Sequence, residues 1–348
     1  MVDLFAVTTR GLEAISAEEL AALPGVGAVT TEYRRVIARA QAPLTRLLTL
    51  RTVDDLFLSQ ATWEGLGPER VALARLQAQA AQLDLRPAAT LCASVRPIAD
   101  PPTFSVTANF VGHRNYTTDE IKLACSSSIG DRHRGWAYTG DDREADLNVR
   151  VFVEHATAHV GVRLADQPLQ NRPYKQAHVL GSLRPPVAAA MAWLAGIRSR
   201  DRILDPCCGA GTLLIEAAAL GAVALGGDRD PAALTAARAN AADADISVGL
   251  QCWDARAIPF ARGAMPRVIT NPPWGRKIAI EADAAAFYQQ IGREIRRVLA
   301  PSGRAVVLTW MPEWVRAWDM HIVREIEISL YGRAPTIMVL ELSSLPTL

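Results

Sequence analysis

From residue 187 onward, short apolar runs alternate with segments that have helical periodicity. The apolar runs lie at 201–204, 222–226, 247–252, 267–270 and 305–309, and helical segments at 211–220, 231–242 and 284–299 lie between them. Strands that alternate with helices in this way are typical of a parallel sheet. Two further runs, 322–330 and 336–342, flank a Tyr331-Gly332 turn and predict an antiparallel hairpin at the end of that sheet.

The first 164 residues have a different pattern, which predicts two α+β regions. Residues 1–65 follow the order β-α-β-β-α-β, which is the order of a ferredoxin-like domain, with its second helix at 43–51. Residues 66–164 predict a helix at 68–83, a strand at 104–108, a helix opened by a Thr117-x-x-Glu120 capping box and a final strand pair. Residues 165–186 are polar and aperiodic, so we expect a linker to a domain at 187–348.

A polar residue follows each of the first four strands predicted after residue 187. Asp205, Asp228, Asp254 and Asn271 take these places in turn. In open α/β sheets, ligands bind at the carboxyl ends of the strands. An acid after the second strand is where a ribose diol is held. The pattern therefore predicts one ligand site built from four strand ends.

The turn after the first of these strands contains Gly209 and Gly211, which allow a ligand to approach the backbone closely. A dinucleotide fingerprint needs a third glycine, but Leu214 stands at that place. Asp205 also favours a ligand with cationic groups over a pyrophosphate. We expect Cys207 and Cys208 to be small residues of the turn rather than a redox or metal site.

The fourth strand ends abruptly at Asn271-Pro272-Pro273-Trp274. The prolines have no backbone N–H, so the strand cannot continue as a paired ladder. The Asn271 carboxamide oxygen and the Pro272 carbonyl are two acceptors that suit the two protons of a planar amine, and Trp274 offers a face for stacking. A tight turn beside a core tryptophan is the alternative explanation of this tetrapeptide.

Composition limits the remaining classes of protein. A length of 348 residues suggests about two domains, and a net charge of +1 gives no general attraction to nucleic acid. No apolar run reaches the roughly 18 residues of a membrane span, and the N-terminus lacks a secretory signal. The five cysteines do not suggest a disulfide framework. We therefore expect a cytoplasmic monomer without metal.

Two resemblances follow from these residues. Residues 66–164 resemble the THUMP domain, an RNA-binding module, through Phe104, Val106, Gly112, Tyr116, Glu120, Ile121, Gly161 and Val162. Residues 187–348 resemble class I S-adenosylmethionine-dependent methyltransferases that modify exocyclic amines, whose Asn-Pro-Pro-aromatic motif is catalytic. This second resemblance implies a Rossmann-like fold with a seven-stranded sheet, and catalytic roles for Asn271, Pro272 and Trp274. It also implies cofactor contacts at Asp205, Cys207, Gly209, Gly211, Thr212, Asp228, Arg229, Asp254, Ala255 and Asn271.

The whole chain resembles the THUMP-containing tRNA guanine-N2 methyltransferases. That resemblance implies tRNA as the partner and methylation of guanosine N2 in the acceptor stem, at position 6. The basic residues expected to contact RNA are Arg132, Arg134, Arg172, Lys175, Arg276 and Lys277. The alternatives are an rRNA guanine-N2 methyltransferase, a tRNA methyltransferase for another position, a DNA adenine or protein glutamine methyltransferase, and a non-catalytic RNA-binding factor.

Overall fold

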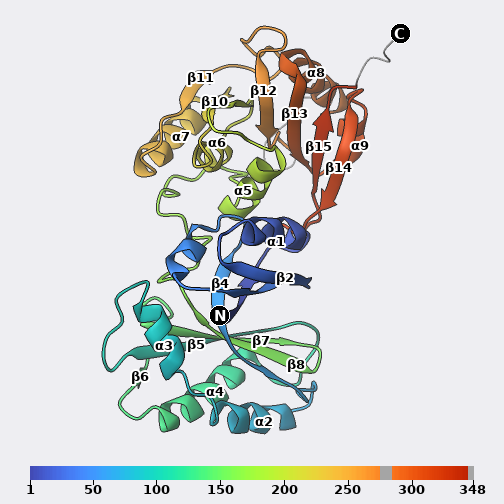
Figure 1. The fold of residues 1–348 in the computed structure, drawn as a ribbon. Helices are drawn as coiled ribbons and strands as arrows, with labels where there is room; N and C mark the ends of the chain where they lie inside the picture. The colour runs from blue at the N-terminus through green and yellow to red at the C-terminus, as the bar shows by residue number, and fades with distance from the viewer. Residues whose placement is uncertain (275–283, 344–348) are drawn as a thin grey trace. The chain divides into compact units, whose positions relative to one another are not determined.

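The computed structural model describes residues 1–274 and 284–343, and the chain divides into two compact units (Figure 1). The N-terminal unit comprises Met1–Val7 and Ala17–Leu169, and the C-terminal unit comprises Thr8–Ser16 and Gln170–Leu348. Within the described residues, none of the helices has the length and apolar character that a bilayer crossing requires.

The N-terminal unit contains an eight-stranded sheet with the order β2-β3-β1-β4-β8-β7-β5-β6. Strand β4 pairs with β1 along one edge and with β8 along the other. The predicted regions 1–65 and 66–164 therefore contribute to one continuous sheet. Its strands are β1 (Val2–Val7), β2 (Val26–Glu32), β3 (Arg35–Ala40), β4 (Asp55–Trp63), β5 (Thr103–Phe110), β6 (Ala137–Tyr138), β7 (Leu147–Glu154) and β8 (Thr157–Arg163).

Many of the buried apolar side chains of this unit form one core, to which α2, α4 and the sheet contribute. The capping box predicted at Thr117 and Glu120 is confirmed, with both reciprocal hydrogen bonds present. A 3-10 helix replaces the helix predicted at 43–51, and its buried residues Leu44 and Leu47 are three positions apart. The helical elements are α1 (Glu13–Ala21), η1 (Leu44–Thr49), α2 (Val71–Ala80), α3 (Arg86–Ala93) and α4 (Thr118–Arg132).

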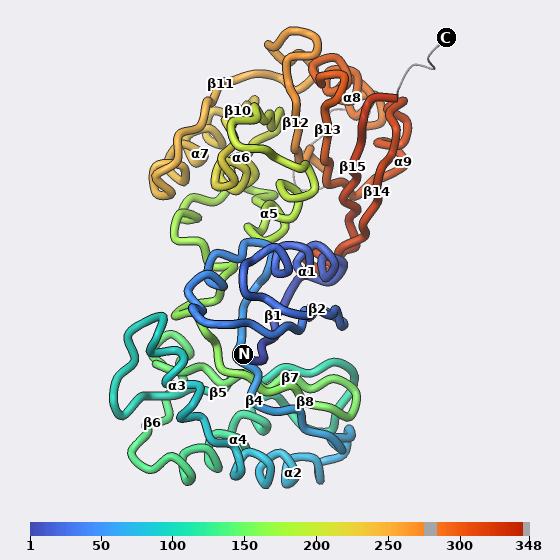
Figure 2. Tube along the Cα trace, viewed as in Figure 1, coloured from blue at the N-terminus to red at the C-terminus, as the bar shows by residue number. Residues whose placement is uncertain are grey.

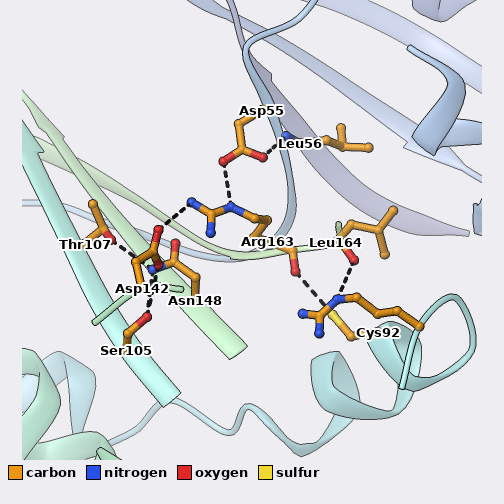
Figure 3. Close-up of polar contacts among 10 residues, drawn as sticks. Asp55, Leu56, Cys92, Ser105, Thr107, Asp142, Asn148, Arg163 and Leu164 are labelled. Carbon is orange, nitrogen blue, oxygen red and sulfur yellow. Dashed lines mark hydrogen bonds and ion pairs between the residues drawn. The ribbon is translucent and has the colours of Figure 1, made fainter. Parts of the chain in front are cut away.

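The same sheet also holds a buried polar network around Arg163 of β8 (Figure 3). The guanidinium donates to Asp55 Oδ2 at 2.8 Å and to Asp142 Oδ2 at 3.0 Å. Ser105 donates to the second Asp142 oxygen, and Asn148 donates to Ser105 in turn. Because Arg163 is 3% exposed, these partners replace the water that its charge would otherwise bind.

The C-terminal unit contains a seven-stranded sheet with the order β11-β10-β9-β12-β13-β15-β14. Strand β15 pairs antiparallel with both β13 and β14, whereas the pairs from β11 to β13 are parallel. The predicted terminal hairpin is confirmed, and Figure 2 traces its two strands side by side. The strands are β9 (Arg202–Asp205), β10 (Val223–Asp228), β11 (Gly249–Cys252), β12 (Met265–Thr270), β13 (Leu299–Thr309), β14 (His321–Glu327) and β15 (Thr336–Glu341).

Successive residues of the central strands pack into different cores. Ile203 and Ile269 join the core that contains α5 and α6, whereas Leu204 and Val268 join the core that contains α8. A strand buried on both faces has this continuous apolar pattern. The structure is thus the predicted Rossmann-like fold, with helices α5 (Pro185–Leu194), α6 (Thr212–Ala218), α7 (Pro231–Asp243), α8 (Ala284–Val298) and α9 (Pro312–Arg316).

A segment from near the N-terminus also packs in the C-terminal unit. Leu12 and Ile15 are fully buried in the core formed with α5 and α6. Gly11 has φ +95°, and a Cβ at this position would lie 2.1 Å from the carbonyl oxygen of Glu327. The close approach of the two backbones therefore requires glycine here.

Candidate active site

The turn after β9 is built around the buried carboxylate of Asp205. Its Oδ1 accepts a hydrogen bond from the Cys207 N–H at 3.1 Å. Burial and, to a smaller extent, the nearby Asp228 carboxylate raise the pKa of the Asp205 carboxyl to about 7. A cation bound beside Asp205 would stabilise the ionised form and lower this pKa.

The two predicted glycines of this turn have different roles. The Gly209 N–H donates to Asp228 Oδ2 at 3.0 Å, which ties the turn to the end of β10. Gly211 has φ +80°, and a Cβ there would lie 3.1 Å from the Cβ of Ala237. Gly209 lines the cavity described below and Gly211 does not. The structure therefore explains Gly211 by close packing against α7 rather than by contact with a ligand.

Asp228 and Asp254 lie at the ends of β10 and β11. Asp228 accepts one backbone N–H on each oxygen, from Gly209 and from Asp230, both at 3.0 Å. Each carboxylate oxygen keeps capacity for another donor such as a diol. Asp254 is held by Arg256 at 2.7 Å, and this hydrogen bond keeps the pKa of its carboxyl below the ordinary value.

The turn after β12 brings Asn271, Pro272 and Trp274 to the same edge. Tyr288 of α8 is fully buried and donates its hydroxyl to the Pro273 carbonyl at 3.2 Å, which holds the turn from behind. The Oδ1 atom of Asn271 is buried and has no hydrogen-bond partner in the part of the chain that the structure describes. The Trp274 Nε1 atom is buried without a partner in the same described residues.

These strand ends enclose a cavity of about 260 Å³. It joins the Asp205 turn to the Asn271 turn, so a ligand on one side can meet a ligand on the other. Trp253 forms part of the wall and donates its Nε1 to the Pro206 carbonyl at 3.3 Å. The cavity brings together every predicted cofactor and catalytic residue except Gly211: Asp205, Cys207, Gly209, Thr212, Asp228, Arg229, Asp254, Ala255, Asn271, Pro272 and Trp274.

One wall of the cavity comes from a segment that we predicted as a linker. Residues 179–183 line the cavity, and we call residues 172–183 the strap. Its beginning is anchored on Glu216 of α6, which accepts from Arg172 at 3.2 Å and from Tyr174 at 2.7 Å. The sequence contains one signal for this contact, an acid within the apolar helix that follows the glycine turn, because a buried carboxylate needs a partner.

The hairpin turn between β14 and β15 supplies further cavity residues that the sequence did not indicate. Tyr331 and Arg333 line the cavity, and the Tyr331 hydroxyl donates to the Ser182 carbonyl at 3.2 Å. The Arg333 guanidinium lies over the ring of Trp310, 5.2 Å from its centroid. These contacts connect the turn to the strap within the C-terminal unit.

The residues predicted to contact RNA lie in several environments. Arg132 and Arg134 are exposed at the end of α4. Arg172 is paired with Glu216 and its side chain is 10% exposed, while Lys175 donates to Thr212 at 2.7 Å. Both therefore have partners inside the C-terminal unit. Arg276 and Lys277 lie outside the described residues.

The cysteines and acids do not form an obvious metal centre in the described residues. No group of three or more His, Cys, Asp or Glu side chains there is arranged to hold a metal ion. Burial raises the pKa of the Cys207 and Cys208 thiols. Both are therefore protonated near neutral pH and are poor nucleophiles.

The sequence of this protein is similar to those of known methyltransferases. Residues 172–317 match the model of the RMKL-like methyltransferase domain family. The tRNA (guanine(6)-N2)-methyltransferase of Thermus thermophilus is 32% identical over 321 residues, which cover 89% of either chain. Mouse U6 snRNA (guanine-N(2))-methyltransferase THUMPD2 is 30% identical over 181 residues, 51% of this chain and 33% of that protein.

A solved structure agrees with the sequence match over nearly the whole length. The crystal structure of TrmN from Thermus thermophilus has a TM-score of 0.81 and 28% sequence identity, and the alignment covers 98% of this chain and 99% of that chain. The structural match and the sequence match to the Thermus relative therefore agree over most of the chain. The chain belongs to the family of tRNA (guanine-N2) methyltransferases.

Proposed function

We propose that this protein methylates the N2 amine of a guanosine in tRNA, with S-adenosylmethionine as methyl donor. The observation that carries the proposal is the Oδ1 atom of Asn271, which is buried at the cavity without a donor among the described residues. A buried acceptor without a partner costs about 1–3 kcal/mol. A substrate amine that donates to this atom would remove that cost.

The strand ends fit the cofactor by their chemistry. Asp205 would hold a cationic group, because a cation would stabilise the ionised form of this buried carboxylate. Asp228 would hold the ribose hydroxyls, and Asp254 would accept from the adenine amine. S-adenosylmethionine, when bound, would supply a methyl carbon that bonds to the amine nitrogen while its bond to sulfur breaks and sulfur keeps the electron pair.

The Asn271 turn would prepare the guanine for that transfer. Asn271 Oδ1 and the Pro272 carbonyl accept the two protons of the N2 amine, which draws its lone pair out of the ring. Trp274 provides a face on which the base stacks. The residues contribute position and polarisation, so no general base is required, and the methylated nitrogen gives its proton to water.

The N-terminal unit would bind the RNA as a THUMP-containing region. Arg132 and Arg134 carry exposed charge at the end of α4, and Tyr138 is 47% exposed nearby in sequence. Exposed basic and aromatic side chains suit phosphates and unstacked bases. The target base itself must leave its helix to enter the cavity. The Thermus relative is a tRNA (guanine(6)-N2)-methyltransferase, which favours position 6 of tRNA.

A guanine-N2 position in another RNA is the second candidate, because THUMPD2 is named for U6 snRNA. Its alignment covers 51% of this chain, whereas the alignment with the tRNA enzyme covers 89%. The alignment with the tRNA enzyme covers more of this chain, so we favour tRNA.

Position-resolved mass spectrometry of tRNA nucleosides tests the proposal. Purified protein and S-adenosylmethionine, added to tRNA from cells that lack the protein, should produce N2-methylguanosine at position 6. Asn271→Ala protein provides the matched control for contaminating activity. A methyl group on adenine, or on guanine N1 or N7, would contradict the proposal, as would methylation of rRNA or snRNA in preference to tRNA.

A further inference from the structure

Lys175 places an ammonium group behind one wall of the cavity. Its Nζ donates to Thr212 Oγ1 at 2.7 Å and to Ser182 Oγ at 3.3 Å. Thr212 begins helix α6 and Ser182 lies on the strap, and both residues line the cavity. One cation therefore bridges the two sides of the corner where the strap meets the glycine turn.

The direction of these hydrogen bonds determines what the two hydroxyls offer to a ligand. An ammonium has three donors and no acceptor, so both oxygens must accept from Lys175. The hydroxyl hydrogens of Thr212 and Ser182 are then left to donate to another group. This corner therefore presents two O–H donors backed by a positive charge, an arrangement that suits an anion.

The strap has other anchors besides this ammonium. Arg172 and Tyr174 bind Glu216. Further along, the Asn240 side chain accepts from the Ala177 N–H at 2.8 Å and donates to the Ala177 carbonyl at 2.9 Å. These contacts fix the segment on both sides of the lysine, so the attachment of the strap does not explain why a cation is placed here.

We propose that Lys175 is a positioning residue that supplies, through Thr212 and Ser182, the charge opposite the carboxylate of S-adenosylmethionine. The inference rests on the proposed function, because it requires that the cavity bind this cofactor. The amino-acid end of the cofactor carries a carboxylate and an ammonium next to the sulfonium. Asp205 at the end of β9 suits the cationic groups, and the Lys175 corner suits the anion.

The charges around Lys175 agree with this role. Burial lowers the pKa of its ammonium to about 8, and the Glu216 carboxylate on α6 acts in the opposite direction. Arg172 and Tyr174 on the strap bind that same carboxylate. The group is therefore mostly charged at pH 7, and an anion bound nearby would raise its pKa.

Calorimetric titration with two ligands tests the inference. The first is S-adenosylmethionine, and the second is its decarboxylated form, which keeps the adenosine, sulfonium and ammonium. Lys175→Met should lower the affinity for S-adenosylmethionine by about tenfold or more, the loss expected for a charge-assisted contact. Its affinity for the decarboxylated ligand should be unchanged. Lys175→Arg should restore part of the affinity. Lys122→Met, which removes an exposed lysine paired with Asp119, should change neither.

Each other outcome has a distinct meaning. Wild-type protein that binds neither ligand would contradict the proposed function itself. If wild-type binding is intact, an equal loss of both ligands in Lys175→Met would show that the lysine only holds the strap, and an unchanged affinity would show that it has no role. Either result overturns the inference. If Lys175→Met does not fold, Ser182→Ala provides the test: it must lower the affinity for S-adenosylmethionine and leave the affinity for the decarboxylated ligand unchanged.

Discussion

In the N-terminal unit the buried guanidinium of Arg163 lies between two carboxylates, whereas in the C-terminal unit the buried carboxamide oxygen of Asn271 has no donor among the described residues. Arg163 lies in strand β8 and Asn271 directly follows strand β12, and both polar groups are buried. The first group is satisfied by the protein and stabilises the fold. The second lies at a cavity and is available to a ligand.

Asn148 in the N-terminal unit is an exception to this contrast. Asn148 donates twice within the Arg163 network, but its Oδ1 atom is buried without a partner in the described part of the chain. An unpaired buried atom is therefore not sufficient to mark a site. What distinguishes Asn271 is that it lines a cavity together with Asp205 and Asp228. Four predictions test whether satisfied groups control stability and cavity groups control ligand binding.

The largest effect should follow from Arg163→Met. Removing the cation leaves Asp55 buried without its main partner, and the loss of one member of a buried pair typically costs about 3–5 kcal/mol of unfolding free energy. Urea denaturation, followed through the unfolding transition of the N-terminal unit, measures this loss of unfolding free energy. Arg39→Met, in an exposed pair with Asp3, is the control and should change little. Equal stability of the two variants would remove the distinction between satisfied and open groups.

A second prediction concerns the wall of the cavity. A Cβ at Gly227 would lie 2.0 Å from the Trp253 ring, so Gly227→Ala should displace this tryptophan and cost about 1–3 kcal/mol of stability through overpacking. Thermal denaturation and cofactor titration should both show the loss. Gly140→Ala is the matched control, since a Cβ there meets nothing within 4 Å. Unchanged cofactor affinity in Gly227→Ala would mean that Trp253 does not shape the site.

The third prediction separates a ligand group from a structural group. Asp228→Ala should weaken the binding of S-adenosylmethionine by about 1–3 kcal/mol, because the ribose hydroxyls would lose their acceptor. The Gly209 N–H also loses its acceptor, so the melting temperature without ligand must be compared. Calorimetry that finds wild-type affinity would exclude Asp228 from the cofactor site.

The smallest effect should be the pH dependence of cofactor binding. Because burial raises the pKa of Asp205 to about 7, its carboxyl becomes protonated as the pH falls below that value. A cationic ligand then loses its partner, and affinity should fall by about threefold between pH 7.5 and pH 6.5. Titrations between pH 5.5 and 7.5 measure this, and Asp205→Asn should remove the dependence. A flat wild-type profile would show that Asp205 does not hold a cation.

Local patterns predicted the elements of the C-terminal unit well, because buried strands and their helices have distinct periods. The polar residues at the strand ends could be identified for the same reason, since the place where a strand stops is a local property. Asp205, Asp228, Asp254 and Asn271 all reach the cavity that this reasoning predicted.

The contacts between distant segments could not be predicted in this way. The strap is polar and aperiodic, and its position depends on Glu216 and Asn240, which are 42 and 63 residues from their partners Tyr174 and Ala177. The joining of the two N-terminal regions by β4 is likewise a pairing across the sheet that no periodicity encodes.

The most direct test of the account is a paired measurement on Asn271→Ala: the single-turnover rate of tRNA methylation and the calorimetric affinity for S-adenosylmethionine. The rate should fall by about 10²-fold or more, as for the loss of one electrostatic partner at a reacting group. Affinity for the cofactor and stability without ligand should remain, because the Asn271 oxygen has no donor in the described protein. A wild-type rate, or a loss of stability comparable to that of Arg163→Met, would contradict the claim that Asn271 Oδ1 is an acceptor for the substrate amine.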